Sequence, residues 1–222
     1  MSPEQIFNLL KENMKHSPAI NSAIFNTLRI LKKVNKGDTY LENYLYHYNK
    51  RGNTFLDYYH LLWTIGSIIK PRKIMEIGCR TGISICQLLS SIVDLKPEKV
   101  VLFDLFGDGF LSPELVKLNL NYLNIDTSKI EFVVGDSSKT VPEYKDTFDY
   151  ILVDGNHERS AAKKDLDNVT SMFNPGGILI FDDIAPDGCN LIDVWESFKK
   201  EHDDFYFTEN FDGKGVGIGV KK

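Results

Sequence analysis

The stretch Ile74-Met75-Glu76-Ile77-Gly78-Cys79-Arg80-Thr81-Gly82 decides the fold of this 222-residue chain. It places Gly78 and Gly82 in a turn between a short apolar strand and the helix that follows. Glycine lets the backbone approach a ligand closely, because a side chain at the same place would collide with it. Glycine also occurs in such turns for packing reasons alone. The turn by itself therefore predicts ligand binding and packing equally well.

Short apolar strands alternate with helices from Pro71 onward, which is the pattern of a parallel sheet with crossover helices. The expected strands are Lys73–Ile77, Lys99–Asp104, Ile130–Val134, Phe148–Asp154 and Gly177–Asp182, followed by an antiparallel pair, Phe205–Thr208 and Val216–Val220. The expected helices are Ile85–Val93, a segment capped by Ser112 with Pro113 in its first turn, Ala161–Phe173 and Leu191–Phe198. We predict an α/β fold: a Rossmann-like, doubly wound, mostly parallel seven-stranded sheet with helices on both faces.

The first 70 residues show helical periodicity and almost no strand signal. Ser2 and Pro3 look like the N-cap and first-turn proline of one helix. Apolar residues at helical spacing predict a second helix from Ile20 to Val34. We expect residues 1–70 to form an N-terminal helical extension, either a lid or a dimerisation surface, and residues 71–222 to form the main domain.

Aromatic residues are concentrated between the second predicted helix and the first strand. They are Tyr40, Tyr44, Tyr46, Tyr48, Phe55, Tyr58, Tyr59 and Trp63. We expect a helix over Thr54–Ile69, and core packing of these rings is the favoured interpretation. The alternative is that several rings line a pocket for a flat or sugar-like substrate, since aromatic faces bury a large area at little entropy cost.

Composition and charge exclude several classes of protein. A net charge of −5 and a pI near 5.6 oppose the broad positive field of a nucleic-acid binder. Cys79, Cys86 and Cys189 lack metal-finger spacing and are typical of free thiols in a reducing compartment. We see neither a secretory signal nor the roughly 20 apolar residues that a bilayer span needs. We expect a cytoplasmic protein that binds neither nucleic acid nor membrane.

Polar residues follow three successive strands at one edge of the predicted sheet. Glu76 precedes the glycine turn, Asp104 ends the next strand, and Gly135-Asp136-Ser137 follows the third. Ligands of open α/β sheets bind at this edge, where an acid suits two ribose hydroxyls. The two glycines lie four residues apart with Arg80 between them, which does not match the dinucleotide pattern Gly-x-Gly-x-x-Gly. A nicotinamide-dependent oxidoreductase is therefore disfavoured.

These motifs, between about Ile74 and Val220, resemble those of class I S-adenosylmethionine-dependent methyltransferases. The resemblance implies that the glycine turn contacts the methionine part of the cofactor, Asp104 the ribose, and Asp136 with Ser137 the adenine. The cofactor-binding residues expected in this way are Glu76, Gly78, Cys79, Arg80, Gly82, Asp104, Leu105, Asp136, Ser137 and Asp154. Arg80 replaces the family's usual middle glycine, so it either reaches a carboxylate of the ligands or is a solvated surface charge.

Asp154-Gly155-Asn156-His157 at the end of the fourth strand faces Asp182-Asp183 at the end of the fifth. Neighbouring strands lie about 5 Å apart, so these carboxylates should converge. Bare carboxylates repel one another unless a cation neutralises them, and oxygen ligands suit Mg²⁺, or Mn²⁺ and Ca²⁺. The structural alternative is that Asp154 or Asp183 caps a following helix.

This region resembles the sugar O-methyltransferases of macrolide and aminocoumarin biosynthesis. The positions that carry the resemblance are Asp104-Leu105-Phe106, Asp154, Gly155, His157, Asp165, Pro175-Gly176-Gly177, Asp182 and Asp183. The resemblance implies that Asp154, Asp182 and Asp183 bind Mg²⁺. His157 is the candidate catalytic base, because neutral imidazole accepts protons near physiological pH, whereas Asn156 cannot accept one. The alternative is a histidine that caps a helix or hydrogen-bonds an aspartate.

Together these observations predict an S-adenosylmethionine-dependent O-methyltransferase that uses a divalent metal. The expected partner is a small polyhydroxylated acceptor such as a sugar or glycoside, and a homodimer or higher homo-oligomer is compatible with the aromatic N-terminal region. The first alternative is a metal-independent small-molecule O- or N-methyltransferase. A non-catalytic module that binds S-adenosylmethionine is a weaker alternative, since sequence alone never proves turnover.

Overall fold

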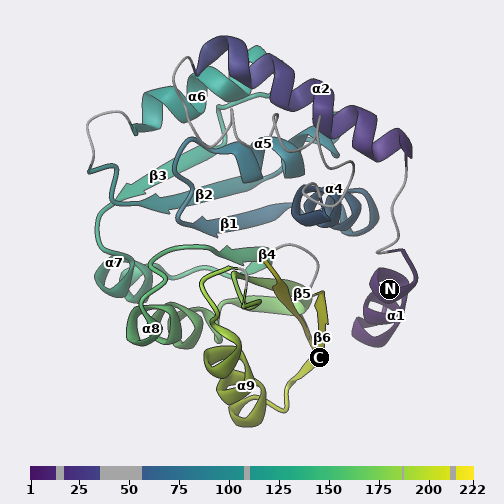
Figure 1. The fold of residues 1–222 in the computed structure, drawn as a ribbon, viewed down its shortest axis with the longest axis vertical. Coiled ribbons are helices and arrows are strands. Elements are labelled where there is room, and N and C mark those ends of the chain that lie inside the picture. Colours follow the sequence, from purple (N-terminus) through teal and green to yellow (C-terminus); the bar gives the residue numbers. More distant parts are fainter. Residues whose placement is uncertain (14–17, 36–56, 108–110, 187, 211–213) are drawn as a thin grey trace.

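The computed structural model describes residues 1–13, 18–35, 57–107, 111–186, 188–210 and 214–222. Within these ranges one seven-stranded sheet has the order β3-β2-β1-β4-β5-β7-β6 (Figure 1). Its strands are β1 (Lys73–Ile77), β2 (Lys99–Asp104), β3 (Ile130–Val134), β4 (Phe148–Val153), β5 (Phe173–Asp182), β6 (Phe205–Asn210) and β7 (Val216–Lys221). The first five are parallel, and β7 runs antiparallel to both β5 and β6. The predicted fold class is confirmed.

Helices cover both faces of the sheet, as expected when every parallel strand is followed by a crossover (Figure 1). They are α1 (Pro3–Asn13), α2 (Pro18–Val34), α4 (Asp57–Ile69), α5 (Ile83–Ser90), α6 (Pro113–Tyr122), α7 (Ser137–Glu143), α8 (Arg159–Val169) and α9 (Ile192–Glu201). Alternate residues of a strand serve the two faces, since Ile74 packs with α1, α2, α4, α5 and α6, and Met75 packs with α7, α8 and α9. None of the described helices combines the length and apolarity needed to cross a bilayer.

Several predicted boundaries were wrong, most of all around β5. The helix expected to reach Phe173 ends at Val169, and Phe173 instead begins β5, where it pairs with Phe148. The strand β5 therefore begins before the predicted start at Gly177, with an irregularity between the Phe148–Phe173 pair and the Tyr150–Ile178 pair. The strand β4 ends at Val153 rather than at the predicted Asp154, so Asp154 lies in the loop that follows.

Smaller differences concern the helices. The helix after β1 covers Ile83–Ser90 rather than Ile85–Val93, and the last helix covers Ile192–Glu201 rather than Leu191–Phe198. The sequence did not predict α7, which has only seven residues and contains Pro142. The predicted cap of α6 is confirmed, because the Ser112 hydroxyl accepts a hydrogen bond from the Leu115 N–H.

The N-terminal helices share one apolar cluster with the sheet. Buried residues of α1 and α2, among them Leu10 and Leu28, belong to the same cluster as Ile74 of β1. Tyr58 and Tyr59 of α4 are buried there too, in agreement with the favoured interpretation of the aromatic stretch. The other tyrosines of that stretch and Phe55, together with residues 54–56 of the predicted third helix, lie outside the described residues.

Candidate functional site

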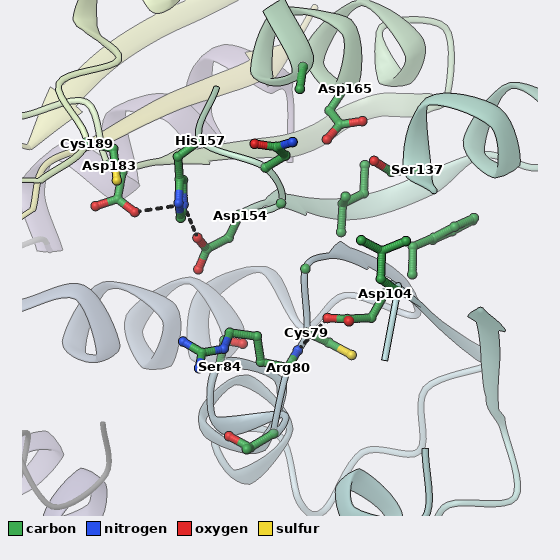
Figure 2. Close-up of a pocket in the computed structure, with 18 of the residues that line it drawn as sticks. Cys79, Arg80, Ser84, Asp104, Ser137, Asp154, His157, Asp165, Asp183 and Cys189 are labelled. Carbon is green, nitrogen blue, oxygen red and sulfur yellow. Dashed lines mark hydrogen bonds and ion pairs between the residues drawn. The ribbon is translucent and has the colours of Figure 1, made fainter. Parts of the chain in front are cut away.

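A cavity of about 940 Å³ opens at the carboxyl ends of the parallel strands. Its walls come from the loops after β1 to β5, from α4 and from the loop that enters β7. Figure 2 shows the polar side chains that face it, with the residues after β1 and β2 on one side and those after β4 and β5 on the other. The cavity lies where ligands of open α/β sheets bind.

Gly78 occupies the closest contact between two strand ends. Its φ is +85°, a conformation that L side chains rarely adopt, and a Cβ added there would lie 2.0 Å from the carbonyl oxygen of Asp154. Gly82 has φ +76°, and its added Cβ would meet Val116 of α6 at 2.6 Å. Gly78 therefore lines the cavity because nothing larger fits, whereas Gly82 serves helix packing and is not part of the wall.

Asp104 points toward the glycine turn, as predicted. One carboxylate oxygen accepts the backbone N–H of Arg80 at 2.7 Å (Figure 2). The other accepts the backbone N–H of Phe106 at 2.9 Å. Arg80 holds φ +46° at the place of the family's usual glycine, and Leu105 is 67% exposed at the cavity wall. These backbone bonds fix the Asp104 carboxylate relative to the turn.

Asp136 and Ser137 also reach the cavity, at the start of α7. The Asp136 carboxylate caps this helix by accepting the Ser138 N–H at 3.0 Å and the Ser138 hydroxyl at 2.7 Å. The hydroxyl and N–H of Ser138 lower the pKa of Asp136, so that it stays ionised. The cap was not anticipated from the sequence, although Asp followed by two serines is a common N-terminal signal of a helix.

Glu76 lies behind the turn rather than in the cavity. Its side chain is buried and accepts a hydrogen bond from the Ser84 hydroxyl of α5. Burial raises the pKa of Glu76 to about 8, partly opposed by the bond from Ser84. Since Glu76 is not among the residues that line the cavity, its position is that of a buried link between β1 and α5.

Asp154, Asp182 and Asp183 converge, as the spacing of β4 and β5 predicted. Each offers a carboxylate oxygen, and the three oxygens lie within 4.8 Å of one another. Their side chains are 19%, 0% and 8% exposed, respectively. Burial and Asp154 raise the pKa of Asp182 well above its ordinary value, while Lys214 opposes this shift. We call these three residues the acidic cluster.

Helix capping does not explain the acidic cluster. Glu158 caps α8 by accepting the Ala161 N–H at 3.3 Å, and Leu191 precedes α9 without a capping side-chain bond. Oxygen donors at such mutual distances fit a divalent cation of the Mg²⁺ class. The donor set of the acidic cluster therefore suits the predicted metal.

His157 bridges two members of the acidic cluster. Its Nε2 lies 3.2 Å from Oδ1 of Asp154 and 3.0 Å from Oδ2 of Asp183 (Figure 2). These hydrogen bonds, first that to Asp154 and then that to Asp183, raise the pKa of His157 to about 10. In this arrangement the ring holds a proton at neutral pH and binds the carboxylates as a cation.

Lys214, in the loop before β7, is the site residue that the sequence did not reveal. Its Nζ pairs with Asp182 and lies 3.7 Å from Oδ2 of Asp154 and 3.7 Å from Oδ2 of Asp183. It also lies 4.6 Å from the centre of the Tyr58 ring. A lysine between two glycines near the C-terminus carries no motif, so only the antiparallel β5–β7 pairing reveals its position.

Two further residues complete the cavity wall. Cys189 is an exposed free thiol close to His157 and Asp183, and Cys79 and Cys86 are free and buried. Asp165 of α8 is buried and points toward the Ser137 side of the cavity (Figure 2). Burial raises the pKa of Asp165 to about 6, partly opposed by the Ser137 hydroxyl. Asp165 is thus an acid that titrates near neutral pH beside the start of α7.

Two comparisons relate the chain to known methyltransferases. A family model described as a methyltransferase domain matches residues 75–184. A sequence search of curated proteins found no match.

Solved structures with the same fold include an O-methyltransferase from Bacillus cereus in complex with S-adenosylhomocysteine, with a TM-score of 0.64 at 18% identity over 87% of this chain and 91% of that one. TomG of Streptomyces achromogenes, an O-methyltransferase involved in tomaymycin synthesis, has a TM-score of 0.63 at 17% identity over 94% and 91%. CalS11, a TDP-rhamnose 3'-O-methyltransferase of calicheamicin biosynthesis, has a TM-score of 0.57 at 19% identity over 93% and 96%. These likenesses extend over most of each chain.

Proposed function

We propose that the chain is a class I S-adenosylmethionine-dependent methyltransferase and that it methylates a hydroxyl oxygen of a small polyhydroxylated molecule. The observation that carries the proposal is one cavity with two different ends. At one end a backbone-anchored aspartate faces a glycine turn, and at the other the acidic cluster faces the same space.

The donor end would hold the cofactor through Asp104 and the glycine turn. Asp104 is anchored by two backbone N–H groups, which leaves its remaining acceptor capacity directed at a ribose diol. Gly78 allows the methionine part to pass close to the backbone. The cofactor supplies a methyl group on a positively charged sulfur, and this chain supplies the alignment that brings an oxygen in line with it.

The acceptor end would hold a divalent cation on Asp154, Asp182 and Asp183. Such an ion lowers the pKa of a bound hydroxyl and orients it. The fit of the three oxygens supports Mg²⁺ or Mn²⁺ at this position. Because the acidic cluster and the glycine turn share the wall near Gly78, a hydroxyl at the cluster would face the donor end.

His157 stays our candidate for the proton acceptor. It faces the cavity between Asp154 and Asp183, 40% exposed, within reach of a hydroxyl held at the acidic cluster. With a pKa raised to about 10 it keeps its proton, so the role requires that another cation satisfy the same carboxylates. In that event Nε2 would be released to accept the hydroxyl proton.

A sugar or glycoside is the acceptor class that we favour. The narrower sequence resemblance and the shared fold of CalS11, named as a TDP-rhamnose methyltransferase, support it. Within the N-terminal extension, α4 contributes Tyr58 and Tyr59 to the cavity wall. Aromatic faces of this kind pack against sugar rings.

A second candidate is a methyltransferase that works without a metal. The observation that favours it is Lys214, whose ammonium group already contacts all three carboxylates. The two candidates differ in whether the reaction requires a metal. Activity that survives a chelator would favour the second, and an anomalous Mn²⁺ signal touching the acidic cluster would favour the first.

Calorimetry with S-adenosylhomocysteine tests the proposal. We expect the unmodified protein to bind this product with micromolar affinity, and Asp104→Ala to weaken binding about 100-fold, because a charged hydrogen-bond partner is lost. Asp203→Ala is the matched control, since Asp203 is exposed and outside the cavity, and its affinity should be unchanged. Absence of binding by the unmodified protein would end the proposal.

A further inference from the structure

Lys214 lies where a cation is needed most. The Asp182 carboxylate is fully buried beside two other carboxylates, and it pairs with the Lys214 ammonium. Two carboxylates this close cannot both stay ionised in a buried site without a positive charge beside them. Lys214 therefore neutralises part of the acidic cluster from within the chain.

Two observations indicate that this placement is specific. The Lys214 Nζ lies at the same 3.7 Å from Asp154 and from Asp183, so it is shared among the carboxylates. The Tyr58 ring of α4, whose centre is 4.6 Å away, provides a cation–π contact as well. The position of the ammonium group is thus defined by the ends of β4 and β5 and by α4.

We propose that Lys214 is a built-in counter-ion of the acidic cluster, and that it excludes a divalent cation until its ammonium group moves aside. The inference rests on the proposed function only in taking the acidic cluster as the metal position. A metal ion on the same three oxygens would come within a few ångströms of the ammonium group, and two cations at that distance repel strongly in a partly buried site.

Lys214 can leave the acidic cluster at low structural cost. Its side chain is 27% exposed and belongs to a loop rather than to the sheet. Gly215 follows it with φ +74°, and a Cβ there would meet Ala185 at 2.6 Å, so the backbone beneath the lysine is fixed while the long side chain is not. Exchange between the lysine and a metal therefore needs a side-chain movement alone.

The consequence is a weakened affinity for metal. Removing the ammonium group leaves three carboxylates without this partner, which destabilises the metal-free protein and strengthens the binding of a divalent ion. Lys214→Arg keeps the positive charge and should behave like the unmodified protein. Lys214→Gln removes it at similar length.

The experiment measures Mn²⁺ binding by electron paramagnetic resonance and thermal unfolding with and without Mn²⁺. Expected are a lower Tm for metal-free Lys214→Gln, a much larger rise of its Tm with Mn²⁺, and binding of Mn²⁺ at least about tenfold tighter than in the unmodified protein. The control Lys33→Gln changes an exposed lysine of α2 and should leave the affinity unchanged. Equal Mn²⁺ affinity of the unmodified protein and Lys214→Gln, or no binding by either, would overturn the proposal.

If Lys214→Gln does not fold without metal, the same comparison is made after refolding in MnCl₂. The proposal expects Mn²⁺ to recover the folded variant, and failure to recover it counts against the proposal. Binding of S-adenosylhomocysteine, measured on the same samples, separates the two conclusions. Its absence contradicts the proposed function and leaves the Mn²⁺ comparison intact, whereas equal Mn²⁺ affinities contradict the role of Lys214 alone.

Discussion

The two ends of the cavity stabilise their carboxylates in different ways. At the end of β2, Asp104 accepts hydrogen bonds from the backbone of Arg80 and Phe106. At the ends of β4 and β5, the Asp182 carboxylate also accepts the Asp183 backbone N–H, but the charge of the acidic cluster is balanced by two side chains, His157 and Lys214. Backbone donors are fixed with the fold, whereas side-chain cations can move or be replaced. The donor end of the cavity is therefore preorganised, and the acceptor end is exchangeable.

This difference fits the proposed division of labour. A cofactor common to many enzymes needs an invariant frame, and backbone hydrogen bonds provide one without an ion. An acceptor that must lose a proton needs charges whose arrangement can change during the reaction. The donor end would therefore be insensitive to metal, while the acceptor end would respond to it.

The largest effect is expected at Gly78, where the two ends of the cavity meet. A methyl group there would lie 2.0 Å from the Asp154 carbonyl oxygen, and the backbone has φ +85°. We expect Gly78→Ala to lower the free energy of unfolding by more than about 3 kcal/mol, because steric overlap and backbone strain add. Urea denaturation followed by circular dichroism measures this loss.

Gly107→Ala is the control for Gly78→Ala. A Cβ added at Gly107 meets nothing within 4 Å, so this change should be nearly neutral. If Gly78→Ala were as stable as Gly107→Ala, the strand ends would not be in the close contact described, and the two ends of the cavity would not share a wall.

A smaller effect on stability is expected for Glu76→Gln, behind the glycine turn. The pKa of Glu76 is raised from 4.5 to about 8, so the folded state favours the neutral carboxyl, and stability is lost as the pH rises from 4.5 through 8. Glutamine stays neutral. The variant should nearly match the unmodified protein at pH 5 and exceed its Tm by roughly 10 °C at pH 8.5.

Calorimetry on Glu76→Gln tests the position of Glu76 at the same time. Because Glu76 lies behind the turn and contacts Ser84, the affinity for S-adenosylhomocysteine should not change. A large loss of affinity would mean that Glu76 contacts the cofactor, as the sequence resemblance implied. An equal Tm difference at both pH values would contradict its raised pKa.

The sequence predicted the sheet well because buried parallel strands leave a strong local pattern. The first three strands agree with the structure at both ends, and the acidic cluster was found from strand ends alone. Phe173 was misassigned because helical spacing of apolar residues continues past Val169, while pairing with Phe148 decides the outcome. Such pairing is a tertiary effect that a single window of sequence does not contain.

The sequence did not reveal several side-chain roles that depend on a neighbour in the folded structure. Glycine is required at position 82 because a larger side chain would collide with Val116 of α6. The Glu76 side chain is turned toward Ser84. Lys214 reaches the acidic cluster only through the pairing of β5 with β7. Val116 is far from Gly82 in the sequence, and the acidic cluster is far from Lys214. Only Ser84 is close in the sequence to its partner, Glu76. Even there, the burial that raises the pKa of Glu76 arises from the packing of α5 on the sheet.

A crystal structure with S-adenosylhomocysteine tests the central claim that one cavity joins a fixed donor end to an exchangeable acceptor end. We expect the ribose hydroxyls on the Asp104 carboxylate and the sulfur atom on the side of Gly78 that faces Asp154 and His157. A ribose bound away from Asp104, or a sulfur atom directed away from the acidic cluster, would contradict the account.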